Sequence, residues 1–447
     1  MLQTRESRLV RTFITGALEM FIAGIALLYG YTRNYESTFG KLSCISFGCA
    51  NAVSTGLLIW WLQKHGIRYG VKHTILHVKM YKSLKRALYE SGMYTERMVL
   101  GKKCAVLPEI DIFFEKDLKS GKVRLKNCIK MDKKLEDLPI SSALLKEYVL
   151  TAAYISDDCN NYNYEFETNK IEQVVFNTFN EFEDYNRKIG EYEIFLDNRH
   201  KVDIIHALIV GQTGSGKSYC IYNLILQMLA KEIPYELYLV DPKFSGVYVL
   251  GYKIDRTNVS ANIEDTILLL KKFEARMDDR KREYADKLLN KLDSDYRDFN
   301  LTPIFLIIDE YSAFRASLAR CEKKTRDFVD EVIGNVIREG RQIGCFCMIA
   351  QQQSNATNLP TELRENLPLK LIMGQAERQT YMTALGIYPD IARRKFLTGQ
   401  GIMTYPQIAS VENPVVVYIP KLNFQIFDAV EQLTSRKNGQ GGRDGVM

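Results

Sequence analysis

A glycine-rich loop near the middle of the chain has the residue types and spacing that could hold a phosphate. Residues 206–218, HALIVGQTGSGKS, run an apolar strand directly into the pattern G-x-x-x-x-G-K-S. Glycines let successive backbone N–H groups turn toward a phosphate, and the helix that follows points its positive end there. Lys217 can then reach the outer phosphates, and the Ser218 hydroxyl is placed to hold Mg²⁺. The pattern predicts that a nucleoside triphosphate binds at Gly211, Gln212, Thr213, Gly214, Ser215, Gly216, Lys217 and Ser218. The alternative is a glycine turn that holds no ligand.

Two adjacent acids close a second apolar run about ninety residues later. Residues 303–310 read PIFLIIDE. Strands of a parallel sheet present their functional residues at the carboxyl end, so these acids are expected beside the phosphate loop. Asp309 can hold the water shell of Mg²⁺, and Glu310 can orient or deprotonate the attacking water. The alternative is an exposed acidic turn.

A third strand, residues 344–350, ends in three glutamines at positions 351–353. A polar amide at such a strand end can sense a γ-phosphate through a hydrogen bond and couple its loss to a loop movement. This interpretation points to Gln352, and the alternative is a polar loop without a special role.

The elements that position these residues alternate between strand and helix from about residue 200 onward. The second strand, residues 236–241 (ELYLVD), ends in Asp-Pro-Lys, and a long amphipathic helix follows at residues 263–289. The last elements are expected at residues 369–374, 376–386 and 396–403. This alternation is typical of an α/β fold with a central parallel sheet covered by helices on both faces.

Two apolar segments stand near the N-terminus, at residues 13–31 and 42–62. Each approaches the ~20 residues that cross a bilayer core, and about ten polar residues separate them. Arginines precede the first segment and basic residues follow the second, so the positive-inside rule predicts a transmembrane hairpin with residues 1–12 and the C-terminus in the cytoplasm. The alternatives are a cleaved signal peptide and a buried hairpin in a soluble domain. Glu19 inside the first span is expected to face another helix or protomer rather than lipid.

The pattern of apolar and polar residues changes over residues 70–195. It is helical at 72–94, alternates as in strands over several short stretches, and is helical again at 141–154. We expect a small α+β accessory domain, for which the sequence indicates no chemistry. The tail, residues 436–447, is polar and glycine-rich and is expected to be disordered.

Composition sets few limits on function. The 447 residues carry a net charge of +6, which neither demands nor excludes nucleic acid. The nine cysteines are scattered without C-x-x-C spacing, which suits a reducing compartment. Cys345 and Cys347 are expected to be small core residues. No metal site is expected apart from the nucleotide's Mg²⁺.

At this point the motifs resemble the FtsK/SpoIIIE family of hexameric DNA-pumping ATPases, over about residues 200–435. The resemblance rests on GQTGSGKS, the DPK after the second strand, IIDE, REGRQIG (338–344), AQQQS (350–354) and LTGQGIM (397–403). It implies a RecA-like P-loop motor over residues 196–435, with ATP and Mg²⁺ as ligands and a homo-hexameric ring around DNA.

The resemblance also assigns two further residues. The family's counterpart of AQQQS usually reads A-T-Q-R-P, so Gln352 takes the place of the sensor glutamine although its neighbours differ. A neighbouring subunit's arginine can neutralise transition-state charge in such rings. Arg378, in GQAERQ, is the first candidate for that role, and Arg338 and Arg341 are the others. Each could instead be an ordinary surface arginine.

Two spans, a short middle module and one motor look most like the TcpA-like coupling proteins of Gram-positive conjugative elements. The implied function is sequence-independent DNA pumping at the cell membrane, together with a relaxase and other conjugation-channel proteins. Residues 354–366 and 315–324 are possible DNA contacts. The alternatives are a motor of the same fold that moves proteins in a secretion system, and a nucleotide-gated scaffold without catalysis.

Overall fold

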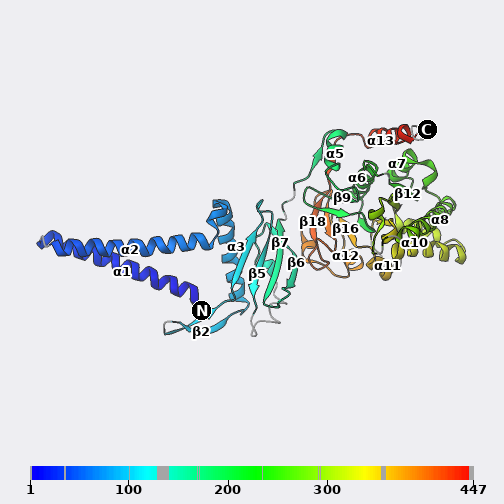
Figure 1. Cartoon of the computed structure of the whole chain (residues 1–447). Coiled ribbons are helices and arrows are strands. Elements are labelled where there is room, and N and C mark those ends of the chain that lie inside the picture. Colours follow the sequence, from blue (N-terminus) through cyan, green and yellow to red (C-terminus); the bar gives the residue numbers. More distant parts are fainter. Residues whose placement is uncertain are drawn as a thin grey trace. The chain divides into compact units, whose positions relative to one another are not determined.

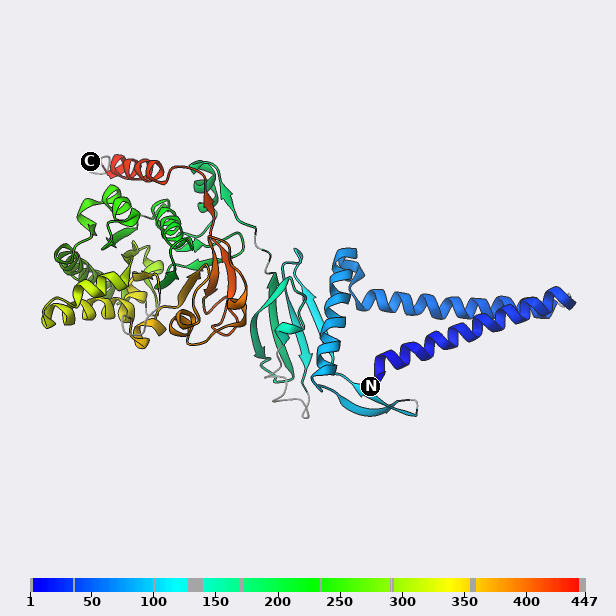
Figure 2. The same ribbon diagram turned by 180° about the vertical axis from the view of Figure 1, so that it is seen from behind.

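The computed structural model describes residues 3–34, 37–99, 101–127, 140–168, 170, 172–233, 235–289, 291, 293–353 and 359–441. The chain divides into two compact units, residues 1–170 and 171–447, each of which has its own hydrophobic core. Figures 1 and 2 show the chain from two sides, with its elements labelled in Figure 1. The two units are described separately below.

Two long helices form the start of the first unit: α1 spans Arg5–Asn34 and α2 spans Ser37–Lys64. Both are long and apolar enough to cross a membrane, and only 11% of each apolar window is buried in the chain. The apolar faces of both helices are thus left largely uncovered by the rest of the described chain. The expected ten-residue polar loop between them is largely helical, because both helices continue past their apolar segments. Glu19 is exposed on α1, so its partner in another helix or protomer stays a prediction.

The two helices pack closely at one end. The Ser43 hydroxyl donates to the Gly24 carbonyl at 2.8 Å, and the Phe47 ring lies where a side chain on Gly24 would be, 3.0 Å from an ideal Cβ. Glycine thus permits the close approach of the helices at this level. In both views α1 and α2 diverge toward the first residues of α1 (Figures 1 and 2).

The rest of the first unit joins one helix to two small sheets. Helix α3 (Val71–Glu90) packs Met80, Leu84 and Leu88 against a four-stranded antiparallel sheet in the order β4-β5-β7-β6. Its strands are β4 (Ile110–Phe114), β5 (Ser120–Lys126), β7 (Asn161–Thr168) and β6 (Tyr148–Ile155). A second sheet has the order β1-β3-β2, from β1 (Gln3–Thr4), β3 (Lys102–Val106) and β2 (Thr95–Val99).

The prediction of a helix at residues 141–154 is wrong. A single 3-10 turn, Ile140–Ser142, precedes β6, which pairs with β7 along its length apart from one bulge. Cross-strand pairing overrides the local helical preference of this segment. The accessory unit is thus α+β, as expected, with more strand than the sequence suggested.

The second unit is built on an eight-stranded sheet in the order β13-β12-β14-β15-β11-β16-β17-β18. The first six strands in this order, from β13 to β16, are parallel to one another. Strand β17 pairs antiparallel with β16, and β18 pairs antiparallel with β17. The strands are β11 (Ala207–Gly211), β12 (Glu236–Val240), β13 (Val259–Ser260), β14 (Ile304–Ile308), β15 (Cys345–Gln351), β16 (Leu369–Met373), β17 (Gln400–Thr404) and β18 (Val415–Tyr418). Cys345 and Cys347 are fully buried in this core, as expected.

Helices cover both faces of this sheet. One group in mutual contact consists of α6 (Lys217–Leu229), α7 (Gly246–Ile254) and α13 (Ile426–Gly441). The other consists of α8 (Ile263–Leu288), α9 (Tyr311–Leu318) and α10 (Lys323–Ile343). Figures 1 and 2 show these groups on opposite sides of the strands. The doubly covered sheet agrees with the α/β motor expected from the sequence.

The boundary expected near residue 195 lies at residue 170 instead. Helix α5 (Phe179–Asn186) and strands β8 (Val175–Phe176) and β9 (Glu193–Phe195) belong to the second unit, because β8 pairs with β19 (Lys421–Leu422) and Phe195 joins the motor core. The tail expected to be disordered from residue 436 is helical through Gly441, and residues 442–447 lie outside the described residues.

Candidate active site

The glycine-rich loop lies between β11 and α6, as its pattern predicts. Gly214 and Gly216 have φ values of +83° and +95°, which L side chains rarely adopt. Gly216 is the N-cap of α6 and supplies no side-chain cap, and no acidic residue occupies the first turn of the helix. The N–H groups at this helix end are therefore free of a competing carboxylate in the first turn, as an anion site requires.

A second loop, which contains Thr398 and Gly399, packs against the phosphate loop. The Gly399 N–H donates to the Ser215 carbonyl at 2.9 Å, and the Thr398 hydroxyl donates to the Gly214 carbonyl at 3.3 Å. An ideal Cβ on Gly216 would lie 2.9 Å from the Gly399 nitrogen, so the two backbones approach too closely for a side chain. Residues 397–399, directly before β17, thus help to fix the shape of the phosphate loop.

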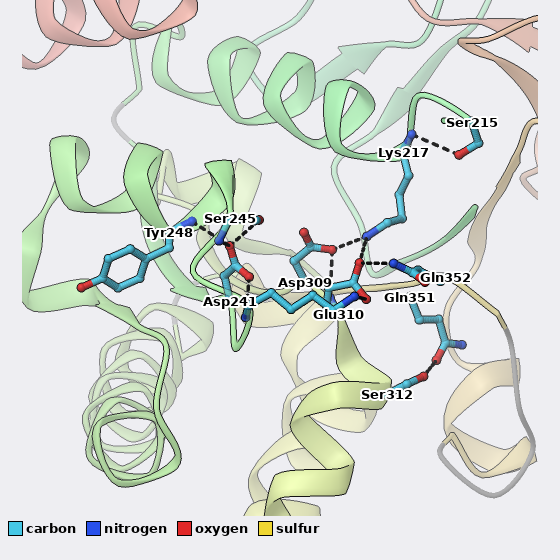
Figure 3. Close-up of polar contacts among 11 residues, drawn as sticks. Ser215, Lys217, Asp241, Ser245, Tyr248, Asp309, Glu310, Ser312, Gln351 and Gln352 are labelled. Atoms are coloured by element: carbon cyan, nitrogen blue, oxygen red, sulfur yellow. Dashed lines mark hydrogen bonds and ion pairs between the residues drawn. The ribbon is translucent and has the colours of Figure 1, made fainter. Parts of the chain in front are cut away.

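The two acids follow β14 and meet the lysine of the loop. Figure 3 shows the Lys217 side chain reaching from the start of α6 to both carboxylates. Its Nζ lies 2.5 Å from Asp309 Oδ1 and 3.1 Å from Glu310 Oε1. All three side chains are nearly buried, with 6%, 2% and 11% exposed. The parallel strand ends have brought together groups that are 92 and 93 residues apart in the sequence.

A second lysine binds Glu310 from the end of β12. Lys243 Nζ lies 2.8 Å from Glu310 Oε2. Its position follows from Asp241, a fully buried carboxylate that accepts backbone N–H bonds from Lys243, Ser245 and Tyr248 (Figure 3). Asp241 thereby holds the turn between β12 and α7 that delivers Lys243 to the site.

These contacts set the charge of Glu310. Burial alone would raise the pKa of its carboxyl, but the hydrogen bond from Lys243 and the charge of Lys217 hold the pKa below its ordinary value. Burial raises the pKa of Asp309, and the Lys217 ammonium opposes this change. Glu310 is therefore ionised near neutral pH, as a group that accepts a proton or orients a water must be.

Two of the glutamines after β15 take different positions. Gln352 Nε2 donates to Glu310 Oε1 at 3.2 Å, so the residue singled out in the sequence touches the second acid. Gln351 is buried, and its Oε1 lies 3.5 Å from the Ser312 hydroxyl of α9. The amide of Gln352 can thus respond to a change at Glu310.

A cleft of about 630 Å³ opens beside these groups, lined by Gln212, Thr213, Lys243, Glu310 and Gln352 among others. Sequence reasoning had singled out most of these residues. In the structure Lys217 contacts Asp309 and Glu310, Gln352 contacts Glu310, and Ser218 follows Lys217 in the first turn of α6.

The candidate arginines lie elsewhere. Arg378 begins α12 (Arg378–Leu385), is exposed, and lies over the Tyr388 ring at 5.6 Å. Arg338 and Arg341 are exposed on α10, where Arg338 lies 3.6 Å from Glu362. None of the three is among the residues that line the cleft. Their role at a neighbouring subunit stays a prediction.

Sequence reasoning missed two contacts. It noted the DPK and LTGQGIM segments, yet it gave no role to Lys243 or to Gly399. Both act on residues more than sixty positions away, so no local pattern reveals the partner. The only sequence signal for these contacts was the presence of the two motifs, DPK with Lys243 and LTGQGIM with Gly399.

Comparisons with known proteins bear on this unit. Residues 185–300 match the model of the FtsK/SpoIIIE family. This part of the chain is an FtsK/SpoIIIE domain. The Ftsk domain-containing protein YdcQ of Bacillus subtilis is 25% identical over 196 residues, which covers 44% of this chain and 40% of YdcQ. The DNA translocase SftA of the same species is 26% identical over 213 residues, covering 45% of this chain and 21% of SftA.

A DNA translocase FtsK of Caldanaerobacter subterraneus is 27% identical over 211 residues, covering 46% of this chain and 28% of that protein. The chain thus spans well under two thirds of the length of these curated relatives. Among solved structures, the pCW3 conjugation coupling protein TcpA, in a monomer form with ATPγS, is similar with a TM-score of 0.49 and 15% identity. That match covers 80% of this chain and 99% of the other.

Proposed function

We propose that this chain is a membrane-anchored, ATP-driven DNA translocase that acts as the coupling protein in conjugative transfer of a mobile element. The observation that carries the enzymatic part is the contact of the phosphate-loop lysine with both acids, Asp309 and Glu310, which follow the segment that matches the FtsK/SpoIIIE family at residues 185–300. A module that only binds nucleotide has no need of the second carboxylate, Glu310, at the position of the attacking water.

Each residue has a distinct task in this proposal. The loop N–H groups and Lys217 bind the β- and γ-phosphates, and Lys217 leaves the carboxylates to do so. Ser218 and Asp309 supply the oxygen ligands that Mg²⁺ prefers, and the ion would neutralise charge on the phosphates. Glu310 orients the attacking water and accepts its proton, while Lys243 keeps the carboxylate ionised. Gln352 reports the change at Glu310 to the loop that follows it.

DNA is proposed as the moving substrate because curated relatives of this domain are DNA translocases. The two apolar helices α1 and α2 support a membrane anchor. The basic residues that flank their apolar segments favour cytoplasmic termini. A homo-hexameric ring, with Arg378 of one subunit at the nucleotide of the next, completes the proposal, and a relaxase is the expected partner on the element DNA.

The test uses the full chain in lipid nanodiscs and measures ATP hydrolysis without DNA, with duplex DNA, and with single-stranded DNA. We expect stimulation by one of the two DNA forms, which also identifies the form that is gripped. Glu310→Gln serves as the matched inactive control, because it keeps the shape of the side chain and removes its charge.

Hydrolysis that ignores both DNA forms would contradict the DNA assignment and favour a motor for protein substrates. A chain that binds ATP without hydrolysing it, with or without DNA, would contradict the enzymatic assignment. For the conjugative role, cells that carry Glu310→Gln in place of the native protein should lose transfer of the element while they retain replication of its DNA.

A further inference from the structure

A groove in the first unit is larger than the nucleotide cleft and is not used by the proposed mechanism. A cavity of about 800 Å³ lies between α1, α2 and α3, where α1 and α2 diverge (Figures 1 and 2). Its walls are mainly apolar and include Ala17, Phe21, Leu57 and Trp61. A neighbouring cavity of about 730 Å³ shares Val10, Leu57, Trp60, Tyr81 and Lys85 with it, so the two form one continuous groove.

One face of α3 forms the charged edge of this groove. Val78, Tyr81, Lys82 and Lys85 line it at the spacing i, i+3, i+4, i+7, which places them on one helix face. Residues Met80, Leu84 and Leu88 on the other face are buried in the core of the unit. The lysines therefore stand at the mouth of an apolar groove.

The lysines gather around one aromatic ring. Lys64 Nζ lies 4.9 Å from the centre of the Tyr81 ring and 3.3 Å from its hydroxyl, and Lys85 Nζ lies 5.9 Å from the same ring centre. Among the described residues, those that line the larger cavity include no carboxylate. Glu109 and Asp111 line only the smaller one, and Glu109 lies 3.4 Å from Lys126. The larger cavity thus combines an apolar interior with a positive edge.

We propose that this groove binds an anionic phospholipid, with its acyl chains between α1 and α2 and its phosphate at Lys64, Lys82 and Lys85. The inference rests on the membrane anchor of the proposed function. Tryptophan and lysine side chains at one end of apolar helices mark the level of the lipid headgroups. Negatively charged lipid is attracted to basic clusters at that level. Charge complementarity therefore selects an anionic phospholipid over a zwitterionic one.

The chain offers a reporter at the site, because its only two tryptophans, Trp60 and Trp61, both line the groove. The full chain is placed in vesicles in which the acyl chains of either phosphatidylglycerol or phosphatidylcholine carry bromine, which quenches tryptophan fluorescence on contact. We expect brominated phosphatidylglycerol to compete at least fivefold better for the groove, since each lysine near the surface contributes roughly a fivefold preference.

Lys82→Gln combined with Lys85→Gln should lower the preference for phosphatidylglycerol to at most the roughly fivefold contribution of Lys64, the remaining lysine of the three. Lys79→Gln is the matched control: it makes the same charge change on an exposed residue of α3 that does not line the groove, and the preference should remain. Ser54→Phe, within the groove, should lower quenching by both lipids alike and tests the acyl-chain half of the site independently.

Equal quenching by the two lipids in the wild-type chain would overturn the inference, and so would an unchanged preference in the double variant. Absence of quenching by either lipid would also overturn it, because protein, such as a second copy of the chain, would then cover the groove. Flotation of the same vesicles separates the two proposals: a chain that floats without quenching retains the membrane anchor and loses only the lipid site.

Discussion

The glycine behind the phosphate loop allows a quantitative test of how that loop is held. Gly399 has φ +84°, and its N–H donates to the Ser215 carbonyl at 2.9 Å. A Cβ at this position would make only ordinary contacts, the nearest 3.5 Å from the Tyr418 ring. Backbone strain is therefore the main cost of Gly399→Ala, and the left-handed conformation costs an L residue roughly 1–2 kcal/mol.

This strain should appear in two measurements. For a unit of this size each 1 kcal/mol lowers Tm by about 2–4 °C, so we expect a decrease of roughly 2–8 °C. The loop relieves part of the strain by moving away from Ser215 and so loses a hydrogen bond worth about 1 kcal/mol. The Kd of a non-hydrolysable ATP analogue, measured by titration calorimetry, should then rise roughly fivefold.

Gly386→Ala is the matched control. Gly386 also has φ +84°, has open space around its Cβ position, and ends α12 away from the phosphate loop. It should lower Tm by a similar amount and leave the Kd unchanged. Gly399→Asn should recover part of both losses, because asparagine tolerates the left-handed region. Equal Kd values for the two alanine variants would refute the supporting role of Gly399, and an unchanged Tm would refute the strain argument.

Four further predictions concern single residues. Lys217→Ala should abolish binding of the ATP analogue, and near-wild-type turnover would exclude the phosphate-loop assignment. Glu310→Gln should bind ATP normally and lose roughly 10²–10⁴-fold in kcat, whereas retained hydrolysis would place the base elsewhere. Mixed Arg378→Ala and Lys217→Ala subunits should recover part of the ATPase activity, and without recovery an arginine of α10 becomes the better candidate. Burial lowers the pKa of His206 to about 3, whereas the unfolded chain binds a proton at this residue below about pH 6.5. The free energy of unfolding should therefore be highest above pH 6.5 and about 2 kcal/mol lower at pH 5. In denaturant titrations of His206→Asn, the free energy of unfolding should depend less steeply on pH than in the wild-type chain. An equally steep dependence would contradict the lowered pKa of His206 as its cause.

The elements around the phosphate loop could be predicted because short-range rules fix them. An apolar run, a glycine loop and an amphipathic run must give strand, turn and helix, and β11 and α6 have these positions. The end of β14 could also be predicted, since two acids after a buried parallel strand lie at the sheet edge where the loop lies. The roles assigned to these residues stay predictions until the variants are measured.

The boundary between the units could not be read from the sequence because it depends on distant pairing. Strand β8 is two residues long, and its partner β19 lies about 245 residues further along the chain. The Gln173 side chain likewise donates to the Ile419 carbonyl, which ties the entry of the unit to its last strands. Local patterns up to residue 195 resemble those of the preceding module, so only these long-range contacts assign the segment to the motor.

The least predictable feature, the second lysine at Glu310, also explains how the proposed site can stay organised during a reaction cycle. Lys217 faces two carboxylates at 2.5 and 3.1 Å and must turn to the phosphates when ATP binds. Removal of that ammonium would raise the pKa of Glu310 if no other cation remained. Lys243 contacts the other oxygen of Glu310 at 2.8 Å, and Asp241 anchors its backbone independently of the phosphate loop. Glu310 therefore keeps one cationic partner whichever group Lys217 binds, and the carboxylate stays ionised at the step that needs a base.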